Sequence, residues 1–300
     1  MSTRRLAVGE DAPELLRSVR VLEMVSRRSA AGLLSGDYQT AIRGQGLLYQ
    51  ESRKYLPGDP VRSIDWNVTA RTGEPYVKVN LEERQRDVYV ALDVSPSMHA
   101  GFQDRTKLEF AIEMAATLGA TAIEGGDRLG WVLFADRVLE DERPAGGRGQ
   151  LFRFLRSLLR RSWPWERPVA ESDPRAAVHA IQRARRGRFV VFLISDFIDH
   201  DVPEDLKYLR PRHDVSLLHV YDPVEFKDAP DVVFGGFSPE GFAGPRLVSP
   251  GAAGSLEATE TFLQREAARY RLTARSCSTA SSVQAELSEL FHAKRTRGAR

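Results

Sequence analysis

Oxygen-bearing side chains follow an apolar run in the first third of the sequence. Asp93, Ser95 and Ser97 occupy alternate positions directly after the run at residues 88 to 92. Because side chains at alternate positions of an extended segment point the same way, all three can face one side of a tight loop. The spacing therefore offers one carboxylate and two hydroxyls to a common ligand.

A second carboxylate follows another apolar run. Residues 189 to 194 end in Ser195 and Asp196, and the loop at residues 171 to 174 adds the hydroxyl of Ser172. Ligands of open parallel sheets bind at the carboxyl ends of the strands, so these loops meet if the two strands are neighbours. An all-oxygen set suits the hard cations Mg²⁺ or Mn²⁺. We therefore predict a metal site formed by Asp93, Ser95, Ser97, Ser172 and Asp196.

Other chemistries find less support in the sequence. Zinc prefers His and Cys, but the six histidines lack paired ligand spacing and Cys277 is the single cysteine. The sequence contains no phosphate-cradling G-x-x-x-x-G-K-[ST] loop, no G-x-S-x-G elbow and no H-E-x-x-H pair. Ser97 and His99 lie too close along the chain for general-base geometry. We expect a binding protein rather than an enzyme, with a metal-dependent phosphoesterase as the alternative.

The elements that would position these residues alternate regularly. Apolar strands at residues 88 to 92, 129 to 134, 189 to 194 and 215 to 220 are separated by helices, which is typical of a parallel sheet covered on both faces. A helix from about 105 to 124 carries an apolar stripe suited to packing on that sheet. The predicted fold class is α/β, with a doubly wound, mostly parallel sheet.

The segments before and after this pattern differ from it. Residues 12 to 34 have helical apolar spacing, and residues 46 to 83 contain short β-like pieces broken by Pro-Gly and Gly-Glu-Pro turns. A Gly/Pro-rich stretch from 229 to 254 precedes a further helix, a strand and a last helix to about 292. We predict three parts, which are an N-terminal helix with a β-rich module (1–84), the sheet domain (85–293) and a flexible basic tail (294–300).

The motif Asp93-x-Ser95-x-Ser97 resembles the start of the metal-ion-dependent adhesion site of von Willebrand factor A domains. Asp196 is similar to the distal aspartate of that site, and Ser172 stands where threonine is usual. The resemblance implies a von Willebrand factor A-like fold, hydroxyls that touch the metal, and a coordination position left for a partner's Glu or Asp.

The upstream segment resembles the signature of the DUF58 family. It reads RKYLPGDPVRSIDW from Arg53 to Trp66 and is followed by Thr-Ala-Arg at 69 to 71 and Glu-Glu-Arg at 82 to 84. Its alternating charges predict a paired network that fixes this module against the sheet domain. Members of this family are commonly associated with MoxR-type AAA+ ATPases, so the resemblance implies such an ATPase or its client as the partner.

Composition and charge restrict the remaining possibilities. The net charge is only +2, but residues 148 to 188 contain 11 arginines, no lysine and three acids. A nucleic-acid-binding role for this segment is therefore a less favoured alternative. Substitution of Arg160 and Arg161 would test it. Apolar runs are too short to span a bilayer, and a single cysteine suits a reducing compartment. We therefore expect a cytoplasmic protein without a membrane anchor.

Overall fold

The computed structural model describes most of the chain. The described residues are 12–34, 38, 48–59, 61, 64–81, 85–101, 105–159, 172–183, 188–197, 204–209, 213–226 and 256–298. They divide into two compact units, Arg43–Arg86 and the remainder. Within the described residues, no helix is both long and apolar enough to cross a membrane.

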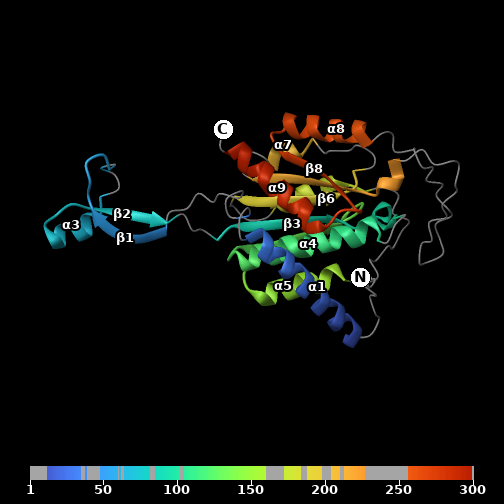
Figure 1. The fold of residues 1–300 in the computed structure, drawn as a ribbon, viewed down its shortest axis with the longest axis horizontal. Helices are drawn as coiled ribbons and strands as arrows, with labels where there is room; N and C mark the ends of the chain where they lie inside the picture. The colour runs from blue at the N-terminus through green and yellow to red at the C-terminus, as the bar shows by residue number, and fades with distance from the viewer. Residues whose placement is uncertain are drawn as a thin grey trace. The chain divides into compact units, whose positions relative to one another are not determined.

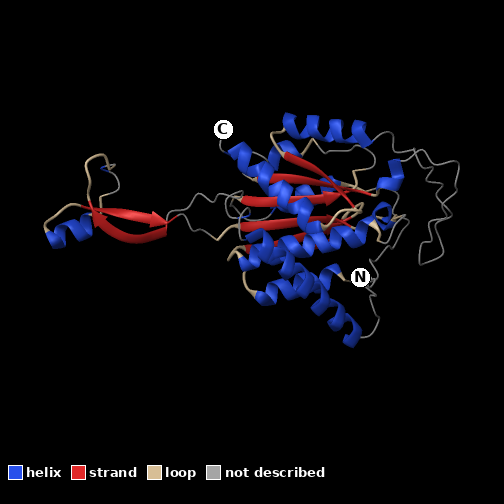
Figure 2. Cartoon of the chain, in the orientation of Figure 1, coloured by secondary structure: helices blue, strands red, loops and turns tan. Residues whose placement is uncertain are grey.

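A six-stranded sheet forms the centre of the larger unit (Figures 1 and 2). The strand order is β5-β4-β3-β6-β7-β8, and every neighbouring pair is parallel except β4 and β5. The predicted fold class, a doubly wound and mostly parallel α/β sheet, is confirmed. The strands are β3 (Asp87–Asp93), β4 (Arg128–Phe134), β5 (Val138–Ala145), β6 (Phe189–Ser195), β7 (Asp214–Tyr221) and β8 (Thr273–Ser278).

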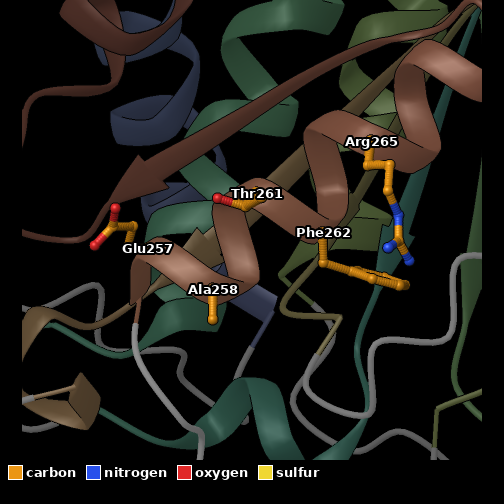
Figure 3. A pocket seen from close by; sticks show the side chains of 5 residues that line it. All are labelled: Glu257, Ala258, Thr261, Phe262 and Arg265. Carbon is orange, nitrogen blue, oxygen red and sulfur yellow. The ribbon is translucent and has the colours of Figure 1, made fainter.

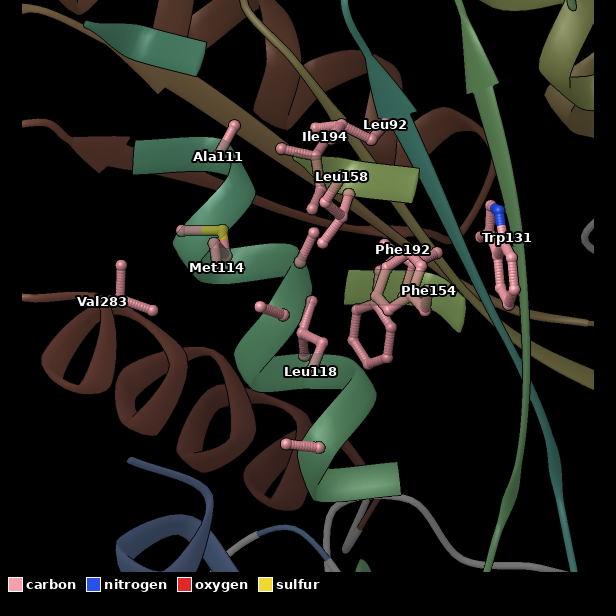
Figure 4. Close-up of a cluster of buried hydrophobic side chains, with 14 of the residues drawn as sticks. Leu92, Ala111, Met114, Leu118, Trp131, Phe154, Leu158, Phe192, Ile194 and Val283 are labelled. Carbon is pink, nitrogen blue, oxygen red and sulfur yellow. The ribbon is translucent and has the colours of Figure 1, made fainter. Parts of the chain in front are cut away.

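Helices cover both faces of this sheet, as Figure 1 shows. Alternate side chains of β3 enter different cores, with Val90 in one and Tyr89 in the other. Figure 4 shows the first core, in which Phe154 lies beside Phe192 of β6. On that side lie α1 (Ala12–Leu34), α4 (Lys107–Glu124), α5 (Arg148–Leu158) and α9 (Val283–Gly298); on the other lie α6 (Pro174–Arg183), α7 (Leu206–Leu209) and α8 (Leu256–Arg269).

Helix α4 begins with a capping box. Thr106 caps the helix by accepting a hydrogen bond from the Glu109 backbone N–H at 3.1 Å, and the Glu109 side chain accepts one from the Thr106 N–H at 2.8 Å. This reciprocal arrangement satisfies two N–H groups that lack helical partners. The first residue inside the helix, Lys107, is therefore held in a defined place.

Helix α1 belongs to the same compact unit as the sheet, whereas the predicted division at residue 84 grouped it with the β-rich module. Its buried residues, Val19, Leu22, Ala30 and Leu33, belong to the first core. Arg27 reinforces the contact through an ion pair with Glu124 of α4, with Nε 2.5 Å from Oε1. The apolar spacing predicts this helix, but amphipathicity alone does not specify which surface the apolar stripe covers.

The predicted tail also differs. Helix α9 continues to Gly298, and Lys294 is buried. Its Nζ donates to Ser216 Oγ at 2.9 Å and lies 2.9 Å from Asp214 Oδ2. These contacts with the start of β7 hold a segment that lacks large apolar residues.

The smaller unit is a hairpin with one short helix. Strands β1 (Leu48–Lys54) and β2 (Tyr76–Leu81) pair antiparallel, and α3 (Trp66–Thr72) lies between them in sequence. Asp65 caps α3 by accepting from the N–H groups of the next turn, and Ser52 Oγ donates to it at 2.8 Å. Arg53 forms two hydrogen bonds with Asp59, at 2.8 and 2.7 Å. This predicted charge pair lies within the module.

Some sequence predictions fall outside the described residues. They concern the Gly/Pro-rich stretch 229–254, the arginines at 160 and 161, the Glu-Glu-Arg run at 82–84 and residues 299–300. Strand β5, by contrast, is described but was not predicted. Its residues are half-exposed or exposed and half of them are charged, which is typical of an edge strand without an apolar run.

Candidate functional site

The predicted site residues lie where the strand order of the sheet reverses. Strands β3 and β6 are parallel neighbours, with Leu92 opposite Ile194. Asp93 ends β3 and Asp196 follows β6, so both carboxylates emerge at the same edge. The chain leaves β3 toward β4 on one side and returns to β6 on the other. Such a switch point, at the carboxyl ends of the strands, is where open α/β sheets bind ligands.

Asp93 is the centre of a hydrogen-bonded cluster. Its Oδ2 accepts from Ser172 Oγ at 2.6 Å and from Ser195 Oγ at 2.7 Å, while Oδ1 accepts from the Ser95 N–H at 2.8 Å. The side chain has no solvent exposure. Burial and the charge of Asp196 raise the pKa of Asp93 to about 6, although the hydroxyl hydrogen bonds oppose this rise. Two loops and the last residue of β6 thus converge on one carboxylate.

Ser95 and Ser97 extend this cluster. Ser95 is buried, Ser97 is half-buried, and their Oγ atoms lie 3.0 Å apart. The backbone enters the short 3₁₀ helix η2 (Pro96–His99) directly after Ser95. Pro96 fixes the start of that turn, because its ring sets φ near the helical value. The two hydroxyls therefore lie side by side at the carboxyl end of β3.

Ser172 reaches the cluster from the loop that precedes α6. The Asp173 N–H donates to the Ala135 carbonyl at 2.8 Å, which ties this loop to the residue after β4. The Asp173 side chain accepts from the Arg175 N–H at 3.0 Å, and Pro174 begins the helix. An Asp followed by Pro is a favourable start for a helix. The two contacts of Asp173 therefore fix the start of α6, and with it the described residue Ser172, beside the end of β4.

Asp196 is buried but has a different partner. Its Oδ2 lies 2.9 Å from Nζ of Lys107, the first residue of α4. The same Nζ lies 2.6 Å from Oε1 of Glu225 in the 3₁₀ helix η3 (Pro223–Phe226). Burial lowers the pKa of Lys107, but the two carboxylates outweigh this effect and the pKa is raised. For Glu225 burial has the opposite sign: it raises the pKa, and the charge of Lys107 only partly offsets this rise.

Sequence reasoning missed Lys107, Ser195 and Glu225. Lys107 and Asp196 are 89 residues apart, so no local pattern joins them. One signal was available: a lysine in the first helical turn opposes the helix dipole and calls for an anionic partner. Ser195 directly precedes Asp196 in the sequence, but it was not predicted to be a member of the site.

The backbone after Asp196 is unusual. Phe197 has a φ of 43° and is nearly buried, and its N–H donates to Ser195 Oγ at 3.2 Å. Left-handed backbone is rare for a bulky aromatic residue and persists only where surrounding contacts enforce it. This turn directs the Asp196 side chain toward α4.

The donors at this edge fit a hard divalent cation. Within the described part of the chain, no three His, Cys, Asp or Glu side chains are grouped so that they could hold a metal. A metal here would therefore depend on the serine hydroxyls together with Asp93 and Asp196. Oxygen donors of this kind are the ones that Mg²⁺ and Mn²⁺ prefer. The residues present are compatible with such an ion.

A separate depression of about 420 Å³ lies on α8 and does not include these residues (Figure 3). In it the Arg265 guanidinium is 5.7 Å from the centre of the Phe262 ring. Its lining residues are Glu257, Ala258, Thr261, Phe262 and Arg265. The candidate site therefore rests on the strand-end cluster and not on this hollow.

Comparison with known proteins identifies relatives of the chain. The family model described as "Protein of unknown function DUF58" matches residues 51–233. Uncharacterized proteins of Mycobacterium tuberculosis and Mycobacterium bovis are each 34% identical over 227 residues, which cover 74% of this chain and 71% of the relative.

Solved structures also resemble the chain. The BatB protein from Bacteroides thetaiotaomicron is 18% identical with a TM-score of 0.48, and the match covers 70% of this chain and 99% of BatB. The VWA domain of SpRpn10 is 13% identical with a TM-score of 0.37, covering 70% of this chain and 95% of that domain.

Proposed function

The chain belongs to the DUF58 family, and we propose that its strand-end site binds a divalent cation through which the protein docks onto an acidic side chain of another protein. In this proposal the hydroxyls of Ser95, Ser97 and Ser172 and the carboxylates of Asp93 and Asp196 hold Mg²⁺ or Mn²⁺. The bound ion supplies positive charge that attracts a partner's carboxylate. The protein is then an interaction module and not an enzyme.

The observation that carries the proposal is an excess of buried negative charge. Asp93 and Asp196 are buried and Glu225 is largely so, yet among the described side chains that contact them only Lys107 is cationic. Three carboxylates against one ammonium leave two negative charges in excess when all groups are ionised. Buried charges are costly unless they are paired or bind a metal. A divalent cation balances this excess.

The partner is proposed from the family resemblance. A MoxR-type AAA+ ATPase, or a client of that ATPase, donates the Glu or Asp that completes the coordination of the metal. We expect the purified cognate ATPase to bind this protein with Mg²⁺ present and to lose binding in EDTA. Equal binding under both conditions would contradict a metal-dependent contact.

Calorimetric titration of Mg²⁺ and Mn²⁺ tests the metal site directly. Wild-type protein should show saturable binding, and the Ser95→Ala/Ser97→Ala double variant should lose it. Ser216→Ala is a matched control, because that buried hydroxyl accepts from Lys294 at the opposite end of the parallel strands. The control should bind as the wild type does. If the wild type binds neither ion, both alone and in the presence of the cognate ATPase, the metal proposal is wrong.

A further inference from the structure

Lys107 forms a buried ion triad at the edge of the candidate site. Its side chain has no solvent exposure, and its Nζ lies between Asp196 Oδ2 at 2.9 Å and Glu225 Oε1 at 2.6 Å. The three residues come from the start of α4, the loop after β6 and the helix η3 after β7. One ammonium thus joins three elements at the carboxyl edge of the sheet.

The position is an unfavourable one for a lysine. The N-terminus of a helix carries partial positive charge, which repels a cation in the first turn. A fully buried ammonium also loses its hydration, and an apolar side chain of similar volume avoids that loss. Packing alone therefore does not explain Lys107. Its charge is what distinguishes it from a methionine at the same place.

Asp196 is the group that Lys107 and a metal would share. In the metal proposal this carboxylate belongs to the coordination set, but in the structure its Oδ2 accepts a hydrogen bond from Lys107. Glu225 gives the ammonium a second anionic partner at a shorter distance. Lys107 therefore keeps one carboxylate even when Asp196 turns toward another cation.

We propose that Lys107 is a built-in cation that competes with the divalent metal for Asp196 and so keeps metal binding weak until a partner adds its own carboxylate. The proposal rests on the proposed metal-dependent function and describes how that site is regulated. Glu225 is the positioning residue that holds the displaced ammonium. The site is thereby set to bind metal tightly only in a complex.

Four variants separate competition from general electrostatics. Lys107→Met removes the competitor and adds one negative charge to the site, whereas Glu225→Gln removes one. The double variant Lys107→Met/Glu225→Gln keeps the net charge of the wild type but frees Asp196. Lys294→Met is the matched control, since it deletes another buried ammonium, held by Asp214 and Ser216 at the opposite edge.

Calorimetric titration of Mg²⁺ is the measurement, with thermal melting to confirm that each variant is folded. The double variant should bind about tenfold more tightly than the wild type, because one charge-assisted hydrogen bond no longer competes. Lys107→Met should bind more tightly still, because its additional negative charge attracts the ion. Glu225→Gln should bind more weakly than the wild type, and Lys294→Met should match it.

Each outcome decides between the two proposals. If the double variant equals the wild type while Lys107→Met binds more tightly, net charge alone controls affinity and competition is refuted. If all variants bind equally, the role of Lys107 is refuted and the metal site stands. Binding by the double variant but not by the wild type supports competition in its strongest form. If neither binds, both proposals fail.

Should Lys107→Met not fold, the double variant decides, because it leaves one carboxylate of the triad without its ammonium instead of two.

Discussion

Replacing Asp93 with asparagine should make the metal-free protein more stable at neutral pH. The carboxyl is buried, and its pKa rises from an ordinary value of 3.8 to about 6 in the folded protein. A rise of that size means that ionised Asp93 destabilises the folded state by about 3 kcal/mol. Asparagine carries no charge and removes this penalty.

The substitution also loses a contact. The asparagine carbonyl oxygen can accept from Ser172 and Ser195 as the carboxylate does, but its amide group cannot accept from the Ser95 N–H. A lost hydrogen bond of this kind costs about 1 kcal/mol. The net expectation is therefore a gain of about 2 kcal/mol in the free energy of unfolding without metal.

The pH dependence follows from the same shift. Because the folded pKa of this acid is raised, its stabilising effect is fully present below the ordinary pKa of 3.8 and is lost as the pH rises through about 6. Relative to Asp93→Asn, the wild type should therefore lose about 2 kcal/mol of stability between roughly pH 4.5 and pH 7.5. Mg²⁺ should restore the wild type at the higher pH and leave the variant unchanged.

Urea denaturation in EDTA, and again with Mg²⁺, measures these differences at both pH values. Comparing wild type with variant at each pH cancels the titration of all other groups that the substitution leaves untouched. A stability difference that is the same at both pH values would refute the assignment of the charge to Asp93. A variant less stable than the wild type in EDTA at neutral pH would show that the hydroxyl cluster alone stabilises the ionised carboxylate.

Two further predictions concern the helix that presents Lys107. Gly119→Ala should destabilise the protein by about 1–2 kcal/mol, because an added Cβ would lie 2.8 Å from the Phe154 ring and overpacking outweighs the better helix propensity of alanine; an increased midpoint in urea would contradict this. Thr106→Ala should cost about 1 kcal/mol through the lost cap, while Thr106→Ser should retain most of the stability, and equal midpoints for the two variants would show that the cap contributes nothing.

The sequence was informative where local pattern determines structure. The apolar run before Asp93 and the run before Asp196 each predict a buried strand, and both are strands of the central sheet. The two strand ends meet only if the strands are neighbours in the sheet. The sequence did not predict that they are neighbours. The pairing of β3 with β6 meets that condition.

What the sequence did not predict depends on contacts between distant segments. The ion pair between Lys107 and Asp196 joins residues that no helical or strand periodicity relates. Strand β5 lies at the sheet edge and carries four consecutive charged residues, so it lacks the apolar run by which strands β3, β4, β6 and β7 were predicted. The surface covered by α1 follows from the packing of α4 against the sheet, which a single amphipathic stripe does not specify.

The two buried carboxylates of the site differ in the kind of partner that surrounds them, and this difference bears on function. Asp93 is held by neutral hydroxyls, which orient it but leave its charge unbalanced. Asp196 is held by a cation, which balances its charge but occupies its oxygen. Under the proposed function, an added divalent ion would balance the charge of Asp93 and would compete with Lys107 for Asp196.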